Sequence, residues 1–224
     1  MRVAALLFDL DGTLVHTDPV HFRAWREVLD RHGVAIDEAG YARRISGRHN
    51  PEIVADLLPS LDAAGRQALI DEKEARFRDL AGRMSPLSGA RELARRAHAA
   101  GMGTAVVTNA PRVNADFMLR ALELDDAFDT VVLGDDLAAA KPDPAPYLEA
   151  LRRLDCPPAE ALAFEDSPSG VRSARAAGVA VVGLATTQRP EALRAEGAEL
   201  VIADFDDPRL RDGPLSDLPM PDAG

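Results

Sequence analysis

Apolar and polar positions follow one another along this chain in blocks that predict strands and helices. Several short apolar runs, rich in valine, leucine and alanine, have the length and composition of buried strands. They cover Val3–Phe8, Thr104–Val107, Thr130–Leu133, Ala161–Phe164, Val179–Leu184 and Leu200–Ile202. From residue 103 onward these runs alternate with helical stretches, and such alternation predicts a parallel sheet covered by helices on both faces. The pattern therefore predicts an α/β fold with a doubly wound parallel sheet.

The long stretch between the first two predicted strands shows only helical spacing. One helix is predicted to begin with Asp18 as its N-cap and Pro19 at its first position, and to end before Gly33. Further helices are predicted from near Pro51 and from about residue 62 to residue 82. These helices interrupt the alternation of strands and helices, so they indicate an insertion.

The pattern divides the chain into three parts. Residues 1–15 and 84–207 are expected to form the α/β core domain, whose first helix covers about residues 87–100. Residues 16–83 are expected to form an inserted helical domain. The tail, residues 208–224, has several prolines and no periodicity, and is predicted to be irregular.

Charge and composition exclude some classes of function. The formal net charge is 26 − 37 = −11, whereas a nucleic-acid-binding protein needs a basic surface. Cys156 is the only cysteine, so no intrachain disulfide can form and a reducing compartment is expected. No apolar run is long enough to cross a membrane. We expect a cytoplasmic monomer that binds neither nucleic acid nor membrane.

Two carboxylates follow the first predicted strand. Asp9 and Asp11 come directly after the apolar run, and Gly12 allows the chain to turn away. Carboxylates at the end of a buried strand are unfavourable unless they are paired. A metal cation and a phosphoryl group are the obvious partners.

Further polar residues follow the later strands and loops, and each is placed near the start of a helix. In open α/β sheets the carboxyl ends of strands and the N-termini of helices meet in one crevice. The residues expected to converge there with Asp9 and Asp11 are Thr108, Asn109, Lys141, Glu165 and Asp166. Carboxylates suit Mg²⁺, and one of them can attack phosphorus. The Thr108 hydroxyl, the Asn109 amide and the Lys141 ammonium suit phosphoryl oxygens.

Four motifs in this order resemble the haloacid dehalogenase superfamily of phosphohydrolases. They are Phe8–Leu14, Val107–Asn109, Lys141–Pro144 and Phe164–Ser167. The resemblance implies that Asp9 is the nucleophile and a Mg²⁺ ligand. It implies that Asp11 is the general acid and base and ligates the metal through its carbonyl. Asp166, supported by Glu165, would complete the metal site, with Thr108 and Lys141 as further catalytic residues.

The inserted helices resemble the cap domain of the β-phosphoglucomutase-like branch of that superfamily. The similar segments are residues 17–25, the loop of residues 46–50, and Lys73. The resemblance implies a gating role for His21. The residues implied to contact the substrate, besides Asn109, are His21, Gly47, Arg48, Asn50 and Lys73.

Three departures from the mutase pattern favour a phosphatase. The mutase has a lysine at the place of Ser46 and an arginine at the place of Asn50, and it has a serine–alanine pair in place of Thr108-Asn109. We therefore expect a Mg²⁺-dependent phosphatase of small phosphorylated metabolites, such as sugar phosphates, acting through an aspartyl-phosphate. The alternatives are a β-phosphoglucomutase-like isomerase and a catalytically silent protein that binds a phosphorylated ligand.

Overall fold

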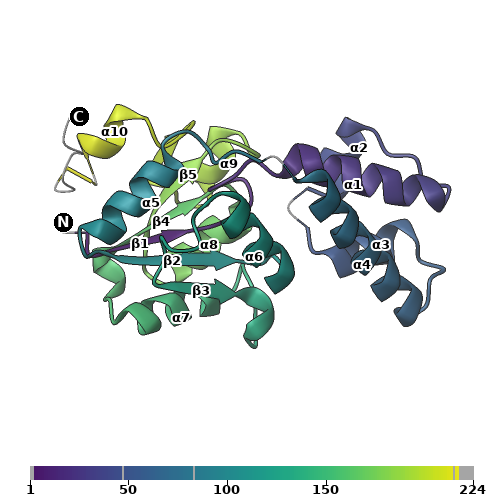
Figure 1. Cartoon of the computed structure of the whole chain (residues 1–224), viewed down its shortest axis with the longest axis horizontal. Coiled ribbons are helices and arrows are strands. Elements are labelled where there is room, and N and C mark those ends of the chain that lie inside the picture. The colour runs from purple at the N-terminus through teal and green to yellow at the C-terminus, as the bar shows by residue number, and fades with distance from the viewer. Residues whose placement is uncertain (1–2, 47, 83, 214, 217–224) are drawn as a thin grey trace. The chain divides into compact units, whose positions relative to one another are not determined.

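The computed structural model describes residues 3–46, 48–82, 84–213 and 215–216. The chain divides into two compact units (Figure 1). The core unit is made of Met1–His16 and Met84–Gly224, and the helical unit of Thr17–Arg83. The helical unit is thus a single continuous insertion after the first strand of the core unit.

The core unit contains a six-stranded sheet with the strand order β3-β2-β1-β4-β5-β6. All neighbouring strands are parallel. Their bounds are β1 Ala5–Phe8, β2 Gly103–Thr108, β3 Thr130–Leu133, β4 Ala161–Glu165, β5 Ala180–Leu184 and β6 Leu200–Ile202. Because Phe8 pairs with Val106 on β2 and with Phe164 on β4, the carboxyl ends of these three strands are level. The predicted doubly wound parallel sheet is confirmed.

Helices of the core unit cover both faces of this sheet. They are α5 Ala90–Ala99, α6 Arg112–Ala121, α7 Ala145–Leu154, α8 Pro168–Ala176, α9 Pro190–Ala195 and α10 Pro208–Arg211. Helix α7 packs on β1, β2 and β3, α8 packs on β4 and β5, and α9 packs on β5 and β6. Helix α5 also packs on β2, and Figure 1 shows it on the side of the sheet opposite α7.

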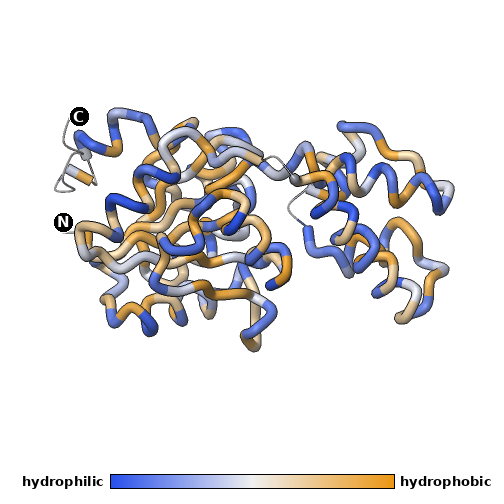
Figure 2. Tube along the Cα trace, viewed as in Figure 1, coloured by the Kyte–Doolittle hydropathy of each residue, from blue (hydrophilic) through white to orange (hydrophobic). Residues whose placement is uncertain are grey.

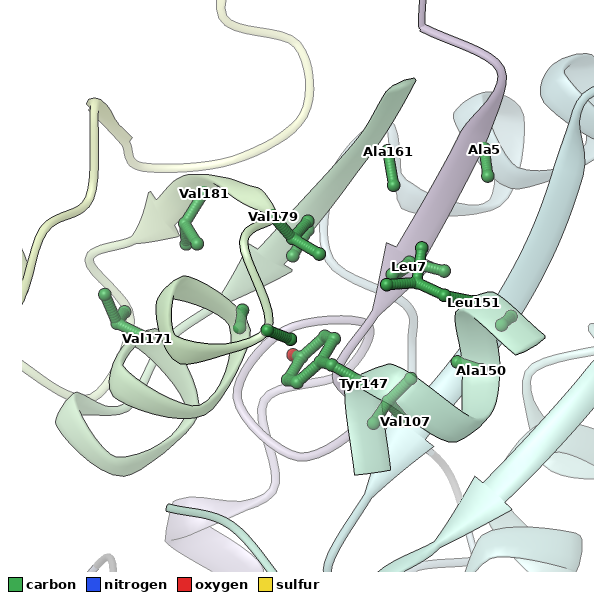
Figure 3. Close-up of a cluster of buried hydrophobic side chains, with 14 of the residues drawn as sticks. Ala5, Leu7, Val107, Tyr147, Ala150, Leu151, Ala161, Val171, Val179 and Val181 are labelled. Carbon is green, nitrogen blue, oxygen red and sulfur yellow. The ribbon is translucent and has the colours of Figure 1, made fainter. Parts of the chain in front are cut away.

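Alternate residues of β1 enter two different parts of the core. Ala5 and Leu7 belong to a buried cluster that α7 and α8 cover with Tyr147, Ala150 and Val171 (Figure 3). Because successive side chains of a strand point to opposite faces, the other residues of β1 enter the apolar core on the other face of the sheet. Figure 2 accordingly shows the strands in hydrophobic colours and the helices in mixed ones. Within the described residues, no helix has the length and apolar character needed to cross a membrane.

Phenylalanine rings fill the other face beside β1 and β4. The Phe8 ring stacks on Phe164, with ring centroids 5.0 Å apart. Phe205 packs against both rings, at centroid distances of 6.0 Å from Phe8 and 5.1 Å from Phe164. This aromatic cluster lies directly beneath the carboxyl ends of the two central strands, because Asp9 and Glu165 are the next residues along the chain.

The helical unit contains α1 Asp18–Arg31, α2 Glu38–Arg44, α3 Asn50–Leu57 and α4 Ala63–Leu80. Its own apolar core includes Trp25, Leu29, Ile53 and Leu69. Helix α4 packs on both α1 and α3. The prediction for this region missed α2, because a seven-residue helix with Tyr41 as its only large apolar residue has too little periodicity to recognise.

The start of α1 differs from the prediction by one residue. Thr17 is the N-cap, and Asp18 is the first helical residue rather than the cap. The Asp18 carboxylate instead accepts hydrogen bonds from Tyr41 Oη at 2.8 Å and Ser46 Oγ at 3.2 Å. These contacts from outside the helix compete with the local capping role that the sequence suggested.

The start of the C-terminal tail also differs from the prediction. Residues 208–224 were expected to be irregular, but α10 begins at Pro208. The Asp207 side chain accepts from the Arg209 backbone N–H, and Leu210 is buried, so a cap and an apolar anchor stabilise this turn. Residues 214 and 217–224 of the tail lie outside the described residues.

The aromatic cluster predicts a large stability loss for Phe164→Ala. Phe164 is fully buried, so the substitution should lower the free energy of unfolding by about 3–5 kcal/mol through lost burial and a residual cavity. Urea-induced unfolding followed by circular dichroism measures this loss. Val113→Ala is the control, because Val113 is 60% exposed and should change stability by less than about 0.5 kcal/mol. Equal effects of the two substitutions would contradict the assigned packing.

Candidate active site

Asp9 and Lys141 form a buried ion pair at the carboxyl end of the central strand. Asp9 is the first residue after β1, and its backbone N–H still bonds to the Phe164 carbonyl of β4 at 3.0 Å. The Lys141 ammonium donates to Asp9 Oδ1 and to the Val107 carbonyl, each at 2.7 Å. Lys141 is only 3% exposed, so this lysine is a component of the site and not a solvated surface residue.

Glu165, the last residue of β4, is held from several sides. Its Oε1 accepts from the Lys141 ammonium, and from the Tyr147 hydroxyl at 2.7 Å. Its Oε2 accepts from Ser167 Oγ at 3.2 Å. A Cβ at Gly170 would lie 2.0 Å from the Glu165 carboxyl group, so only glycine at this position of α8 leaves space for that carboxylate. The side chain is completely buried and its orientation is fixed.

Asp166 is positioned by hydroxyl groups and by a tight turn after β1. Thr187, in the loop after β5, donates from Oγ1 to Asp166 Oδ2. Thr13 Oγ1 lies 3.5 Å from the other carboxylate oxygen. Gly12 has φ of +80°, and a Cβ there would lie 2.1 Å from Asp166 Oδ2. Glycine is therefore required at position 12 both by its backbone conformation and by the approach of Asp166.

Asp9, Glu165 and Asp166 form a group that can hold a metal ion. Each offers a carboxylate oxygen, and the three ligand atoms all lie within 4.8 Å of one another. Carboxylate oxygens are the hard ligands that Mg²⁺ prefers, and Mg²⁺ needs only one or two of them besides water and substrate oxygens. The donor set therefore fits a divalent cation, with Asp9 and Asp166 as its best ligands because Glu165 is already occupied by Lys141, Tyr147 and Ser167.

The charges of the cluster also favour the binding of a divalent cation. Burial raises the pKa of Asp9 to about 7; the charge of Lys141 opposes this rise, and the charge of Glu165 adds to it. Burial, together with the charges of Asp9 and Glu165, holds the pKa of Asp166 well above its usual range. Burial disfavours the Lys141 ammonium, but the two neighbouring carboxylates outweigh it and raise the pKa of Lys141. One ammonium does not compensate three buried carboxylates, so a further cation would stabilise the cluster.

The other predicted residues of the core unit lie around the same strand ends. Thr108 ends β2, is 1% exposed and accepts the Ala110 N–H at 3.0 Å on its hydroxyl oxygen. The Asn109 side chain bonds twice to the backbone of Lys141, as donor and as acceptor, both at 3.2 Å. Asp11 is partly exposed, and its charge contributes to the raised pKa of Asp9. Asn109 thus fixes the segment that carries Lys141.

Several predicted substrate residues meet within the helical unit. The buried Lys73 ammonium lies 2.9 Å from His21 Nδ1 and donates to Glu74 Oε1 at 2.8 Å. The Asn50 amide donates to the same Glu74 oxygen at 2.6 Å. The His21 ring stacks on Phe77 at a centroid distance of 4.1 Å. His21, Asn50 and Lys73 therefore form one polar network, and Glu74 is its shared acceptor.

Arg48 contacts residues other than those of that network. Its guanidinium donates to Asp56 Oδ2 at 2.8 Å and to the Arg44 carbonyl at 3.0 Å. Gly47, the remaining predicted substrate residue, lies outside the described residues. The contacts of Arg48 are those of a partly exposed ion pair, and its role toward a substrate stays a prediction.

Tyr147, Thr187 and Glu74 contact site residues, and the sequence analysis did not identify them. Thr187 had a recognisable signal, because Thr186-Thr187 is a polar pair after an apolar strand, like the other strand-end motifs. Tyr147 and Glu74 lie inside helices, where an aromatic residue suggests packing and an acid suggests solvent. Glu74 follows Lys73 directly in the sequence, but only the tertiary structure shows that Glu74 is buried and also bonds to Asn50, and that Tyr147 contacts Glu165 and Lys141.

This chain matches the model of a known protein family. The model described as haloacid dehalogenase-like hydrolase matches residues 3–178. This range contains all four motifs and the helical unit.

Curated relatives and solved structures are similar over most of the chain. Validoxylamine A 7'-phosphate phosphatase from Streptomyces hygroscopicus subsp. limoneus is 35% identical, with 84% of this chain and 88% of that protein covered. Phosphorylated carbohydrates phosphatase from Thermotoga maritima is 34% identical, with 78% and 82% covered. A crystal structure of a CbbY variant from Rhodobacter sphaeroides, in complex with xylulose 1,5-bisphosphate, has a TM-score of 0.83 and 30% identity, covering 97% of this chain and 100% of that one.

The raised pKa values predict that added Mg²⁺ stabilises the protein more at pH 8 than at pH 5.5. A carboxyl group whose pKa is higher in the folded than in the unfolded protein stabilises the fold at pH values below its unfolded pKa of 3.8. For Asp9 this contribution is lost as the pH rises through about 7, its pKa in the folded protein. Mg²⁺ should replace the lost protons at pH 8 and compete with them at pH 5.5. Thermal unfolding with and without Mg²⁺ should show a gain of about 2 kcal/mol at pH 8 for a well-saturated site, and a much smaller one at pH 5.5.

Asp9→Asn is the control for this experiment. It removes one charge and one ligand oxygen, so the stabilisation by Mg²⁺ at pH 8 should become much smaller. A Mg²⁺ effect of the same size at both pH values in the parent, or one of unchanged size in Asp9→Asn, would show that the cation acts elsewhere on the acidic surface.

Proposed function

The chain belongs to the haloacid dehalogenase-like hydrolase family as a phosphoric monoester hydrolase, and we propose that it is a Mg²⁺-dependent phosphatase of sugar phosphates. The observation that carries this proposal is the buried Asp9, which is paired with Lys141 and belongs with Asp166 to a group of carboxylates that can hold a metal ion. Members of this family generally depend on a metal. The relative named for phosphorylated carbohydrates and the neighbour bound to a sugar bisphosphate support the substrate class.

Asp9 is the proposed nucleophile. One of its carboxylate oxygens attacks phosphorus, the bond from phosphorus to the sugar oxygen breaks, and an aspartyl-phosphate forms. The Lys141 ammonium holds Asp9 through Oδ1, which leaves Oδ2 for attack or for the metal. Since the Asp9 carboxylate must be ionised to attack, the positive charge of Lys141 also maintains its reactive form.

Asp11 is the proposed general acid and base. It gives its proton to the leaving sugar oxygen, and then takes a proton from the water that attacks the aspartyl-phosphate. Inorganic phosphate leaves, and the Asp9 carboxylate is restored. Asp11 thereby regains its proton for the next turnover, and it is partly exposed, unlike Asp9, so the attacking water can reach it.

Asp9 and Asp166 would hold Mg²⁺, with the Asp11 carbonyl as a further ligand implied by the resemblance. When bound, the cation supplies neutralisation of the negative charge on the transferring phosphoryl group. The Thr108 hydroxyl and the Asn109 backbone amide are proposed to bind phosphoryl oxygens. Thr108 Oγ1 accepts from the Ala110 N–H, which leaves the hydroxyl proton to donate.

In the helical unit, we propose that His21, Arg48, Asn50 and Lys73 contact the rest of the substrate. Ser46 and Asn50 stand where a β-phosphoglucomutase has cationic residues. A mutase must hold a bisphosphate by two anions while it excludes water. A chain with fewer cations should bind the second anion less well, so water should attack the aspartyl-phosphate. This difference favours hydrolysis over isomerisation.

Asp9→Asn is expected to lower phosphatase activity at least a thousand-fold, because an amide cannot replace the attacking carboxylate. Phosphate release from p-nitrophenyl phosphate and from a panel of sugar phosphates measures the effect. Circular dichroism checks that the variant remains folded.

Asp136→Asn is the matched control, since Asp136 pairs with Arg112 on the surface of the core unit. It should keep activity within about twofold, as expected for an exposed pair. A folded Asp9→Asn protein that retains more than a few per cent of the parent rate would rule out Asp9 as the nucleophile. A parent protein without phosphatase activity would favour the silent binding protein.

The phosphatase and mutase functions are separated by one assay. Supplied with β-glucose 1-phosphate and a trace of glucose 1,6-bisphosphate, the protein should release inorganic phosphate faster than it forms glucose 6-phosphate. Both products are measured in the same reaction. Faster formation of glucose 6-phosphate would replace the proposed function with the isomerase alternative.

A further inference from the structure

The ammonium group of Lys141 has all three of its N–H donors in use. They donate to Asp9 Oδ1, to the Val107 carbonyl and to Glu165 Oε1. An ammonium carries three N–H donors and no acceptor, so these partners determine where its charge lies. The Val107 carbonyl belongs to the sheet, whereas Glu165 is a side chain that must itself be held in place.

Tyr147 contacts both Lys141 and Glu165. Its hydroxyl donates to Glu165 Oε1 at 2.7 Å, the same oxygen that accepts from Lys141. The Lys141 nitrogen also lies 5.2 Å from the centroid of the Tyr147 ring, within the range of a cation–π interaction. One side chain of α7 therefore contacts the lysine through its ring and the lysine's acidic partner through its hydroxyl.

The ring of Tyr147 is fixed by the core. It is completely buried in the cluster that contains Leu7, Val107 and Leu151, and Figure 3 shows it extending from α7 among these side chains. Burial and the negative charge of Glu165 raise the pKa of the Tyr147 hydroxyl well above its usual range. The phenol therefore remains protonated and remains a hydrogen-bond donor.

We propose that Tyr147 is a positioning residue, which holds Glu165 and Lys141 so that the ammonium is directed at Asp9. The proposal rests on the function proposed above, because it assigns Tyr147 a part in the activity of Asp9. Tyr147 acts through Lys141 and Glu165 and is not itself assigned a contact with the substrate. Packing of α7 on the sheet thereby contributes to the geometry of the nucleophile.

Tyr147→Phe isolates the hydroxyl, because phenylalanine keeps the ring and its packing. Loss of a hydrogen bond to a charged acceptor should let Glu165 and Lys141 shift, and kcat should fall about 10- to 100-fold. KM for p-nitrophenyl phosphate should change less than about threefold, because no substrate contact is removed. A kcat within about twofold of the parent would overturn the proposal.

Tyr41→Phe is the matched control. Tyr41 and Tyr147 are the two tyrosines of the chain, and Tyr41 donates its hydroxyl to Asp18 within the helical unit. The same chemical change at Tyr41 should leave kcat for p-nitrophenyl phosphate within about twofold. An equal fall in kcat for both variants would mean that loss of any buried phenol hydroxyl reduces activity, and would overturn the specific role of Tyr147.

Glu165→Gln tests whether Tyr147 acts through Glu165. If it does, the double variant Tyr147→Phe/Glu165→Gln should have about the same kcat as Glu165→Gln alone, since the hydroxyl has then lost its charged acceptor. Fully multiplicative losses would show that Tyr147 acts independently of Glu165, contrary to the proposal.

A spectroscopic measurement tests the geometry without any catalysis. The chain contains two lysines, Lys73 and Lys141, so ¹⁵N-lysine labelling gives two side-chain ammonium signals, and Lys73→Arg assigns them. In Tyr147→Phe the Lys141 signal should shift or broaden while the Lys73 signal stays in place. An unchanged Lys141 signal would overturn the proposal. If the parent releases no phosphate, the proposed function fails, and the Lys141 signal alone then decides whether Tyr147 holds the lysine.

Discussion

The pairing of Phe8 with Phe164 in the parallel sheet places two carboxylates side by side in a buried site. Asp9 and Glu165 are the next residues along the chain. The strand register that satisfies the backbone hydrogen bonds of β1 and β4 therefore also brings two negative charges together. Without a cation this arrangement would be strongly unfavourable, because a buried carboxylate is stable only when it is paired. Lys141 supplies that cation, and its placement between the two carboxylates is the condition on which the rest of the site depends.

The sheet order explains why this happens at β1 and β4. In the order β3-β2-β1-β4-β5-β6 the chain runs outward from β1 toward β3 and then crosses to β4 on the other side. In open α/β sheets, ligands bind at the point where the strand order reverses. Asp9 lies at one side of this point, and Glu165 and Asp166 lie at the other. The sheet therefore brings together residues that are more than 150 positions apart in sequence.

The sequence predicted the parts of this protein that depend on local pattern. Buried parallel strands are continuous apolar runs, so Thr130–Leu133 and Leu200–Ile202 could be located to the residue. Three of the four motifs stand at the ends of such runs and the Lys141 motif follows a loop, and their order along the chain is why the group of Asp9, Lys141, Glu165 and Asp166 could be anticipated. The roles of individual residues depend on tertiary contacts, and the sequence was less informative there. Asp18 has the local pattern of a helix cap, but its carboxylate binds Tyr41 and Ser46.

The position of β1 in the sheet also bears on how the chain folds during synthesis. The strand at the centre of the core unit is the first to be made, yet its neighbour β4 ends only at Glu165. The contacts within Thr17–Arg83 are all between residues of one continuous segment, and local contacts form faster than distant ones. On the ribosome, the helical unit can therefore assemble while β1 still lacks both neighbours in the sheet. The core unit must wait until β4, which ends at Glu165, has emerged, and until then one edge of the apolar strand β1 remains exposed to chaperones and to aggregation.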